Sequence, residues 1–196
     1  MDNDVSAGST AATPSVSTLG QLALGITLLA FGIGHTRVID GVTAADAVSI
    51  ATYVGGIALF VAGLFALRRD DGLTGTAFAG LGAFWFTWGV GAGDAVSANA
   101  VGLFLLLFAL LALTLTLAAG GAGTFVRGTY GAMFVALVLL AVAEFGDSAG
   151  LAKAGGWVAV VAGVLAWYGA TAPVAGLRMA WPGRGRAAGR GVTAAG

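Results

Sequence analysis

The chain has 196 residues, of which 58% are hydrophobic and only 9% are charged, and its mean hydropathy is +0.94. Soluble domains carry roughly 25% charged residues, so this composition excludes a water-soluble globule. The formal net charge is zero, which argues against nucleic-acid binding through counterion release, and the absence of cysteine excludes disulfides and thiolate metal sites. The composition predicts an all-α integral membrane protein with no nucleic-acid partner.

Both ends of the chain differ from the apolar middle. Residues 1–18 are polar, contain no basic residue and have no apolar core, so they do not resemble a cleavable signal peptide and are expected to form a disordered tail. Residues 178–196 are rich in glycine, alanine and arginine and are expected to form a basic cytoplasmic tail, which either enforces topology or rests on anionic headgroups. Residues 19–177 are predicted to form one transmembrane transporter domain.

Six apolar segments approach or reach the roughly 20 helical residues that cross a bilayer. They are, in chain order, Leu19–Gly34, Ala47–Leu67, Leu73–Gly93, Ala98–Ala119, Gly128–Phe145 and Gly155–Leu177. Many of the 34 glycines lie inside these runs, where the missing side chain lets neighbouring helices approach closely. The segments predict a bundle of six transmembrane helices.

Arginine and lysine set the predicted orientation, because cytoplasmic loops of membrane proteins carry an excess of both. If the amino terminus is cytoplasmic, the outside loops hold only Arg37 and Lys153. The cytoplasmic side then holds Arg68, Arg69, Arg127, Arg178, Arg184, Arg186 and Arg190. Both termini are therefore predicted to be cytoplasmic.

A family resemblance enters at residues 53–85, which read YVGGIALFVAGLFALRRDDGLTGTAFAGLGAFW. The matching features are Gly-Gly-Ile-Ala at residues 55–58, Ala-Gly at 62–63, the basic pair at 68–69, Thr-Ala-Phe at 76–78, Gly at 82 and Phe-Trp at 84–85. This block resembles the second and third helices of the succinate–acetate permease family, also called the acetate uptake transporters. Residues 156–157 and 166–168 look like that family's last helix, and the resemblance extends over about residues 19–176.

The chain also departs from the family pattern. Of the family's amino-terminal N-P-A-P-L-G-L motif only Leu19 and Gly20 remain. The glutamine of the second helix is replaced by Leu59, the glutamate of that helix by Ala66, and the G-N-T-F-G turn by the sequence DDGLT at residues 70–74. The resemblance therefore describes a divergent member, in which the substrate could have changed while the fold is kept.

The resemblance implies a homo-hexamer of six-helix subunits, each with its own pore for small carboxylates. It also implies an apolar constriction of the pore, whose three positions align with Leu24, Leu81 and Met133; all three are bulky and apolar. Four further residues are candidates for the substrate path: Thr27, Tyr53, Leu59 and Thr76. The alternative for a membrane threonine is a hydroxyl that simply bonds the carbonyl one turn earlier.

Neither arginine nor lysine lies in the middle of a predicted span, so two routes for an organic acid stay open. Hydroxyls, backbone N–H groups and helix amino termini could bind the anion, or the acid could cross in its neutral, protonated form. The role of His35 is open between a proton sensor and a helix cap. Glu144 is open between an intramembrane acid and a water-exposed one.

The leading functional hypothesis is a plasma-membrane transporter or channel for small monocarboxylates, acetate first and succinate next, with passive or proton-linked movement. A second hypothesis is another small anion or a neutral solute on the same fold, and a third is a membrane scaffold or sensor that transports nothing. No nucleotide motif, nucleophile–base pair or metal-binding cluster is recognisable. An enzymatic activity, a cofactor and a bound metal are therefore not predicted.

Overall fold

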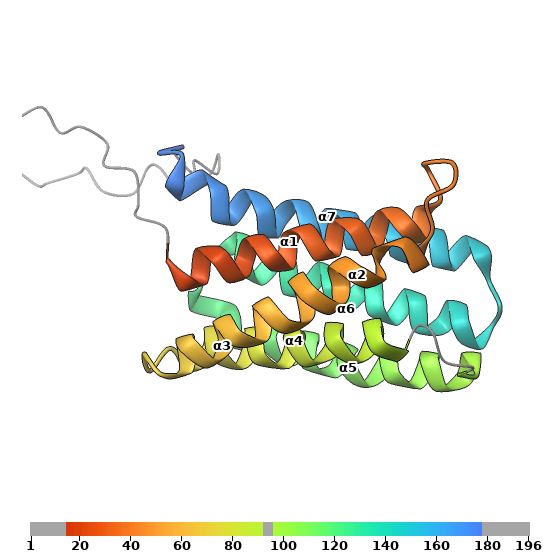
Figure 1. The fold of residues 1–196 in the computed structure, drawn as a ribbon, viewed down its shortest axis with the longest axis horizontal. Helices are drawn as coiled ribbons and strands as arrows, with labels where there is room; N and C mark the ends of the chain where they lie inside the picture. The colour runs from red at the N-terminus through yellow and green to blue at the C-terminus, as the bar shows by residue number, and fades with distance from the viewer. Residues whose placement is uncertain (1–14, 92–95, 178–196) are drawn as a thin grey trace, which may run out of the picture.

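The computed structural model describes residues 15–91 and 96–177, and these fold into six long helical rods that run back and forth beside one another (Figure 1). The first rod is α1 (Val16–Thr36), and the second joins η1 (Ala44–Ala47), α2 (Val48–Ile50), η2 (Ala51–Ala58) and α3 (Leu59–Leu67). The others are α4 (Gly72–Gly91), α5 (Ala98–Ala118) continued by η3 (Ala119–Gly121), α6 (Thr124–Phe145) and α7 (Ala149–Val174).

The two ends of the bundle can be named from the chain itself. The described chain starts at α1 and finishes with α7 at the same end, here called the terminal end, and the other is the distal end (Figure 1). The α3–α4 connection, with Arg68 and Arg69, and the first turn of α6, with Arg127, lie at the terminal end. Arg37 and Lys153 lie toward the distal end, so the charge asymmetry seen in the sequence separates the two ends in space.

Several predicted helix boundaries differ from the structure by three to six residues, and serine side-chain caps explain two of the helix starts. α1 begins three residues before Leu19 because the Ser15 side chain accepts from the Thr18 N–H in a reciprocal capping box. α7 begins six residues before Gly155, where Ser148 accepts from the Leu151 N–H. α6 begins at Thr124 rather than Gly128. Lys153 therefore lies inside the first turns of α7 and not in a loop.

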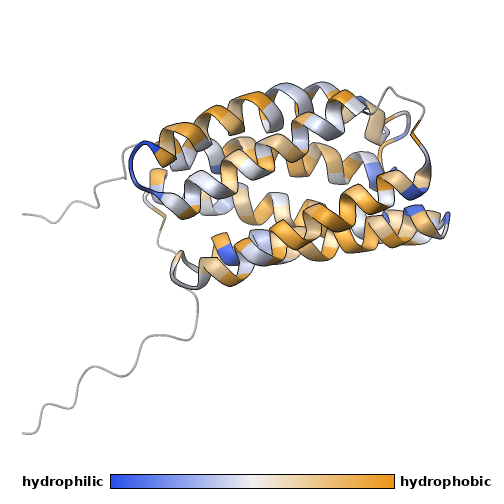
Figure 2. Cartoon of the chain, turned by 90° about the horizontal axis from the view of Figure 1, so that it is seen from below, coloured by the Kyte–Doolittle hydropathy of each residue, from blue (hydrophilic) through white to orange (hydrophobic). Residues whose placement is uncertain are grey.

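The outer surface of the bundle is apolar, as expected of a protein that lipid surrounds. Large hydrophobic side chains are exposed along every rod, among them Ile26, Phe65, Leu107, Val142 and Val164. Hydrophobic residues extend over much of the ribbon in Figure 2. Among the described residues, five helical rods are long and apolar enough to cross a membrane; α4 is 20 residues long but, with its glycines, threonines and tryptophans, is not one of them. The chain is a multi-pass membrane protein, and a sixth crossing by α4 stays a prediction.

Two pairs of rods pack through glycine. A methyl group added at Gly32 of α1 would lie 2.7 Å from both the Gly156 carbonyl oxygen and the Val160 backbone nitrogen of α7. A methyl group added at Gly82 of α4 would lie 2.6 Å from the backbone nitrogen of Phe60 in α3. Because backbone stands directly against backbone, each pair is fixed at close range.

The remaining neighbours around the bundle are not equally close. α6 packs along both α5 and α7, whereas α1 meets η2 and α3 over a shorter stretch, and α4 and α5 approach each other at few positions. Aromatic rings span the α4–α5 seam: Phe84 stacks on Phe104 with centroids 5.4 Å apart and meets Phe108 at 5.1 Å. The pair formed by the second rod and α4 is therefore joined loosely on both sides.

Candidate functional site

The three residues aligned with the family constriction lie together in the bundle interior. Leu24 and Leu81 are fully buried and Met133 is 1% exposed, and all belong to one contiguous apolar cluster. α1, α4 and α6 all begin at the terminal end, and each of these residues comes eight or nine positions after its helix begins. At 1.5 Å per residue, all three stand about 12 to 14 Å into the bundle. Residues from three helices thus form one apolar layer, here called the Leu24 layer.

On the terminal side of this layer lies a polar cavity of about 410 Å³. Its polar lining residues are Ser15, Ser17, Thr18, Gln21, Asp71, Thr74 and Tyr130. Tyr130 comes three residues before Met133 on α6 and is almost fully buried, so it marks the floor of the cavity next to the Leu24 layer. Hydroxyl and amide groups therefore lie on the terminal side of the apolar layer.

Three helix amino termini converge on the same cavity. Residues from the starts of α1, α4 and α6 line it, and each helix start carries a partial positive charge of about half an elementary charge. Ser15 caps α1 and the Asp71 carboxylate accepts from the Thr74 N–H of α4 at 3.1 Å, but Gly123 gives α6 no side-chain cap. The cavity thus combines dipoles that attract an anion with one carboxylate that repels it.

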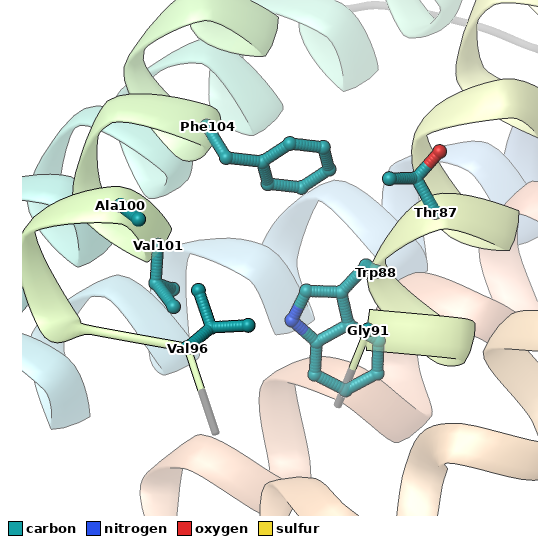
Figure 3. Close-up of a pocket in the computed structure, with 7 residues that line it drawn as sticks. All are labelled: Thr87, Trp88, Gly91, Val96, Ala100, Val101 and Phe104. Carbon is teal, nitrogen blue, oxygen red and sulfur yellow. The ribbon is translucent and has the colours of Figure 1, made fainter. Parts of the chain in front are cut away.

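A second cavity, of about 190 Å³, opens at the distal end between α4 and the start of α5. Figure 3 shows Thr87, Trp88 and Gly91 facing Val96, Ala100, Val101 and Phe104 across it. Its lining is almost entirely apolar, in contrast to the terminal cavity. The two cavities lie at opposite ends of the same subunit, with the Leu24 layer between them.

A small polar group lies just distal to the Leu24 layer. Thr27 is one turn beyond Leu24 on α1, and Trp85 is one turn beyond Leu81 on α4; both are buried. A methyl group added at Gly55 would lie 2.9 Å from Thr27 Oγ1 and 2.8 Å from Trp85 Cγ, which places all three together. Gly55 belongs to η2, a π-helical segment, and such segments occur frequently at functional sites.

The sequence-predicted path residues divide between the interior and the outer surface. Thr27 and Leu59 are buried, and the Thr27 hydroxyl donates to the Ala23 carbonyl at 2.8 Å, one turn earlier. Tyr53 is 65% exposed, and Thr76 is exposed as well. The structure therefore brings only Thr27 and Leu59 into the core that contains the Leu24 layer.

His35 and Glu144, the two ionisable residues whose roles the sequence leaves open, lie toward the distal end. His35, in the last turn of α1, has Nδ1 2.8 Å from the Phe31 carbonyl oxygen and packs its ring on Phe31 with centroids 4.3 Å apart. Glu144 is half-buried in the last turn of α6. The geometry of His35 fits a helix-end contact.

Sequence reasoning missed the position of Trp85. The sequence singles out Trp85 only as part of a family-like Phe-Trp pair, and the two tryptophans Trp157 and Trp167 are exposed on α7. Trp85 is instead 0% exposed, in the middle of an aromatic cluster with Phe31 and Phe84. Trp85 lies four residues after Leu81, and residues four apart share one face of a helix. This spacing could have placed Trp85 on the inward face of α4.

Comparison with known families gives one match over most of the chain. The sequence model of the GPR1/FUN34/yaaH family matches residues 5–181. Among curated proteins, the chain is 27% identical over 170 residues to ammonia transport outward protein 2 of Saccharomyces cerevisiae, covering 80% of this chain and 60% of that protein. The chain thus spans about 60% of the length of this yeast relative.

A bacterial relative and a solved structure cover more of their own lengths. The succinate-acetate/proton symporter SatP of Escherichia coli K12 is 26% identical over 159 residues, covering 76% of this chain and 82% of the symporter. The solved structure of the bacterial acetate channel SatP superposes with a TM-score of 0.75 at 22% identity, covering 84% of this chain and 93% of that one. At this identity the superposition establishes the fold.

Proposed function

Because the chain belongs to the GPR1/FUN34/yaaH family, we propose that it moves small monocarboxylates across the membrane through a path inside each subunit. Acetate is the first substrate to test and succinate the second, since relatives are named a succinate-acetate/proton symporter and an acetate channel. The path runs from the terminal cavity, through the Leu24 layer and past Thr27, to the distal cavity. Movement is passive or coupled to protons.

The arrangement of two cavities around one apolar layer carries this proposal. Each cavity opens at a different end of the subunit, and Leu24, Leu81 and Met133 separate them at a common depth. A layer built from side chains rather than backbone can open by rotamer changes of a few residues. The layer would therefore act as a constriction that excludes water while it is closed.

The chemistry of the path favours a small acid that loses its hydration gradually. Burying an isolated carboxylate in an apolar medium is very costly, whereas the protonated acid avoids most of that cost. The terminal cavity offers hydroxyls and three helix amino termini, which stabilise an anion before it reaches the Leu24 layer. Among the residues lining the two cavities in the described part of the chain there is no arginine or lysine, so the anion need not be trapped by a fixed cation.

Four broader assignments belong to the same proposal. The protein lies in the plasma membrane, crosses it six times with α4 as the sixth span, has both termini in the cytoplasm and forms a homo-hexamer. The distribution of arginine over the two ends supports the orientation, and the hexamer rests on the family resemblance. Native mass spectrometry of the detergent-solubilised protein measures the subunit number directly.

Acetate flux into proteoliposomes tests the function. Vesicles that contain the purified protein are expected to take up labelled acetate faster than protein-free vesicles, and more so when the outside pH is lowered if movement is proton-linked. Competition by unlabelled succinate against the uptake of labelled acetate then shows which of the two substrates the protein prefers. Equal acetate uptake in vesicles with and without protein would remove the proposed function.

A second candidate is a different solute on the same path. The relative named ammonia transport outward protein 2 and the carboxylate of Asp71 in the terminal cavity both favour a cargo that is not an anion. Competition separates the two candidates, because ammonium should reduce acetate uptake only if both share the path. A scaffold or sensor that transports nothing predicts no flux of either solute. The relatives named above are transporters or channels, in line with a role other than catalysis.

A further inference from the structure

Trp85 carries a buried hydrogen-bond donor that no protein group uses. The side chain is 0% exposed, and none of the described residues accepts a hydrogen bond from its Nε1. A buried donor without a partner destabilises a folded protein, so such groups are few in native structures. The Trp85 N–H is therefore free to donate to a partner that the described residues do not supply.

The position of Trp85 gives that donor a place on the proposed path. Leu81 belongs to the Leu24 layer, Trp85 is one turn further on the same helix, and Trp88, three residues later, lines the distal cavity. Trp85 and Trp88 lie edge to face with centroids 6.3 Å apart, and Phe31 contacts both rings. Trp85 thus stands between the apolar constriction and the distal exit.

The surroundings of Trp85 provide a second hydrogen-bonding group at a closely packed junction of three helices. The Thr27 hydroxyl donates its proton to the Ala23 carbonyl, so the hydroxyl oxygen itself is left as an acceptor facing Gly55. Gly55 lies in the π-helical η2, and adding a side chain there would collide with both Thr27 and Trp85. The glycine therefore lets α1, η2 and α4 pack in direct contact at this junction, which has to widen before a solute oxygen can enter it.

We propose that Trp85 Nε1, together with Thr27, binds a hydrogen-bond-accepting oxygen of the solute just distal to the Leu24 layer, once the packed junction of α1, η2 and α4 has widened. The chemical class is a small carboxylic acid or carboxylate. An accepting oxygen takes the Trp85 N–H, and the hydroxyl of a protonated acid donates to Thr27 Oγ1. A solute that only donates hydrogen bonds, such as ammonium, gains nothing from Trp85. This inference rests on the proposed function and deepens it.

Nitrogen-labelled tryptophan makes the donor visible without any substitution. In protein carrying ¹⁵N-tryptophan, acetate is expected to shift one indole N–H resonance downfield in a saturable way, while the same concentration of chloride leaves that resonance unchanged. Trp85→Phe should remove the shifting resonance. If that variant fails to fold, the resonance is assigned by changing each other tryptophan to Phe in turn. The absence of any acetate-specific shift overturns the proposal.

Flux measurements then test the role of the site in transport. Trp85→Phe keeps an aromatic ring but loses the N–H donor. The variant is expected to lower acetate flux about tenfold, because one hydrogen bond to a charged group is lost. Trp157→Phe, on the exposed face of α7, is the matched control and should conduct like the unsubstituted protein. Equal flux through both variants overturns the role of Trp85 while the proposed function stands. No acetate flux through the unsubstituted protein removes the proposed function itself.

Discussion

The α1–α7 seam and the α4–α5 seam differ in what joins the two helices. Along α1 and α7, glycines bring backbone against backbone, so that a methyl group at Gly32 would lie 2.7 Å from main-chain atoms of the partner helix. Along α4 and α5, large aromatic rings such as Phe84 and Phe104 bridge a wider separation that encloses the distal cavity. The first seam has no spare volume, and the second has both volume and movable side chains.

This difference identifies which part of the bundle can move. α1 holds Leu24 in the tight seam, whereas α4 holds Leu81 and Trp85 beside the loose one. α4 is itself fixed to α3 through glycines such as Gly82, so the second rod and α4 form a unit. We expect this unit to shift as one body against α1 and α5 when the Leu24 layer opens. Each prediction below tests the contrast between the two seams.

The tight seam should not tolerate any added side chain. Gly32→Leu is expected to cost more than about 3 kcal/mol, because backbone atoms of α7 cannot move aside as a flexible side chain could. Thermal unfolding in detergent measures the loss. Gly120→Leu is the control: Gly120 is exposed, and nothing lies within 4 Å of an added carbon. Similar melting temperatures for both variants would show that α1 and α7 are not locked together.

Acetate should pass the Leu24 layer more easily when Leu81, its residue on the movable helix α4, is shortened. Leu81→Ala removes most of a fully buried side chain from the layer and is expected to raise acetate flux several-fold. Leu64→Ala makes the same chemical change on α3 at a side chain that is 45% exposed, and should leave flux unchanged. Proteoliposome uptake with matched protein content compares the two. Unchanged flux in Leu81→Ala would mean that the layer is not the constriction.

The loose seam should accept a change that the tight one would refuse. Phe104→Leu keeps an apolar residue of smaller size on α5 and is expected to cost less than about 1.5 kcal/mol. Its small effect on the melting temperature would contrast with Gly32→Leu. A collapse of stability in Phe104→Leu would show that aromatic stacking, rather than adjustable volume, defines the α4–α5 seam.

The smallest expected effect concerns charge at the terminal cavity. Asp71→Asn removes the carboxylate that lines the cavity but keeps a side chain that caps α4 equally well. Acetate entry from this end should rise by about twofold at low ionic strength and return to the original rate at high salt, because salt screens exposed charges. Asp70→Asn, at the neighbouring exposed and left-handed position, is the control. An equal rise in both variants, or a rise that persists in salt, would contradict a local electrostatic effect of Asp71.

The apolar segments in the sequence were enough to predict the helices, but not which face of each helix is buried. A membrane helix is apolar on both its lipid-facing and its inward side, so hydropathy gives little contrast between them. For this reason Tyr53 and Thr76 were candidates for the substrate path although their side chains are exposed, and the burial of Trp85 was not predicted. Helix starts were misplaced where serine caps, such as Ser148, begin a helix ahead of its apolar run.

The common direction of α1, α4 and α6 has an electrical consequence. These three helices supply Leu24, Leu81 and Met133, and all three begin at the terminal end, so their dipoles point the same way along the path rather than cancelling. The second rod, α5 and α7 run the opposite way, so the asymmetry is local to the helix ends rather than a property of the whole bundle. At the terminal cavity the starts of α1, α4 and α6 together supply a positive potential that would remain after the neutralisation of every side-chain charge near that mouth.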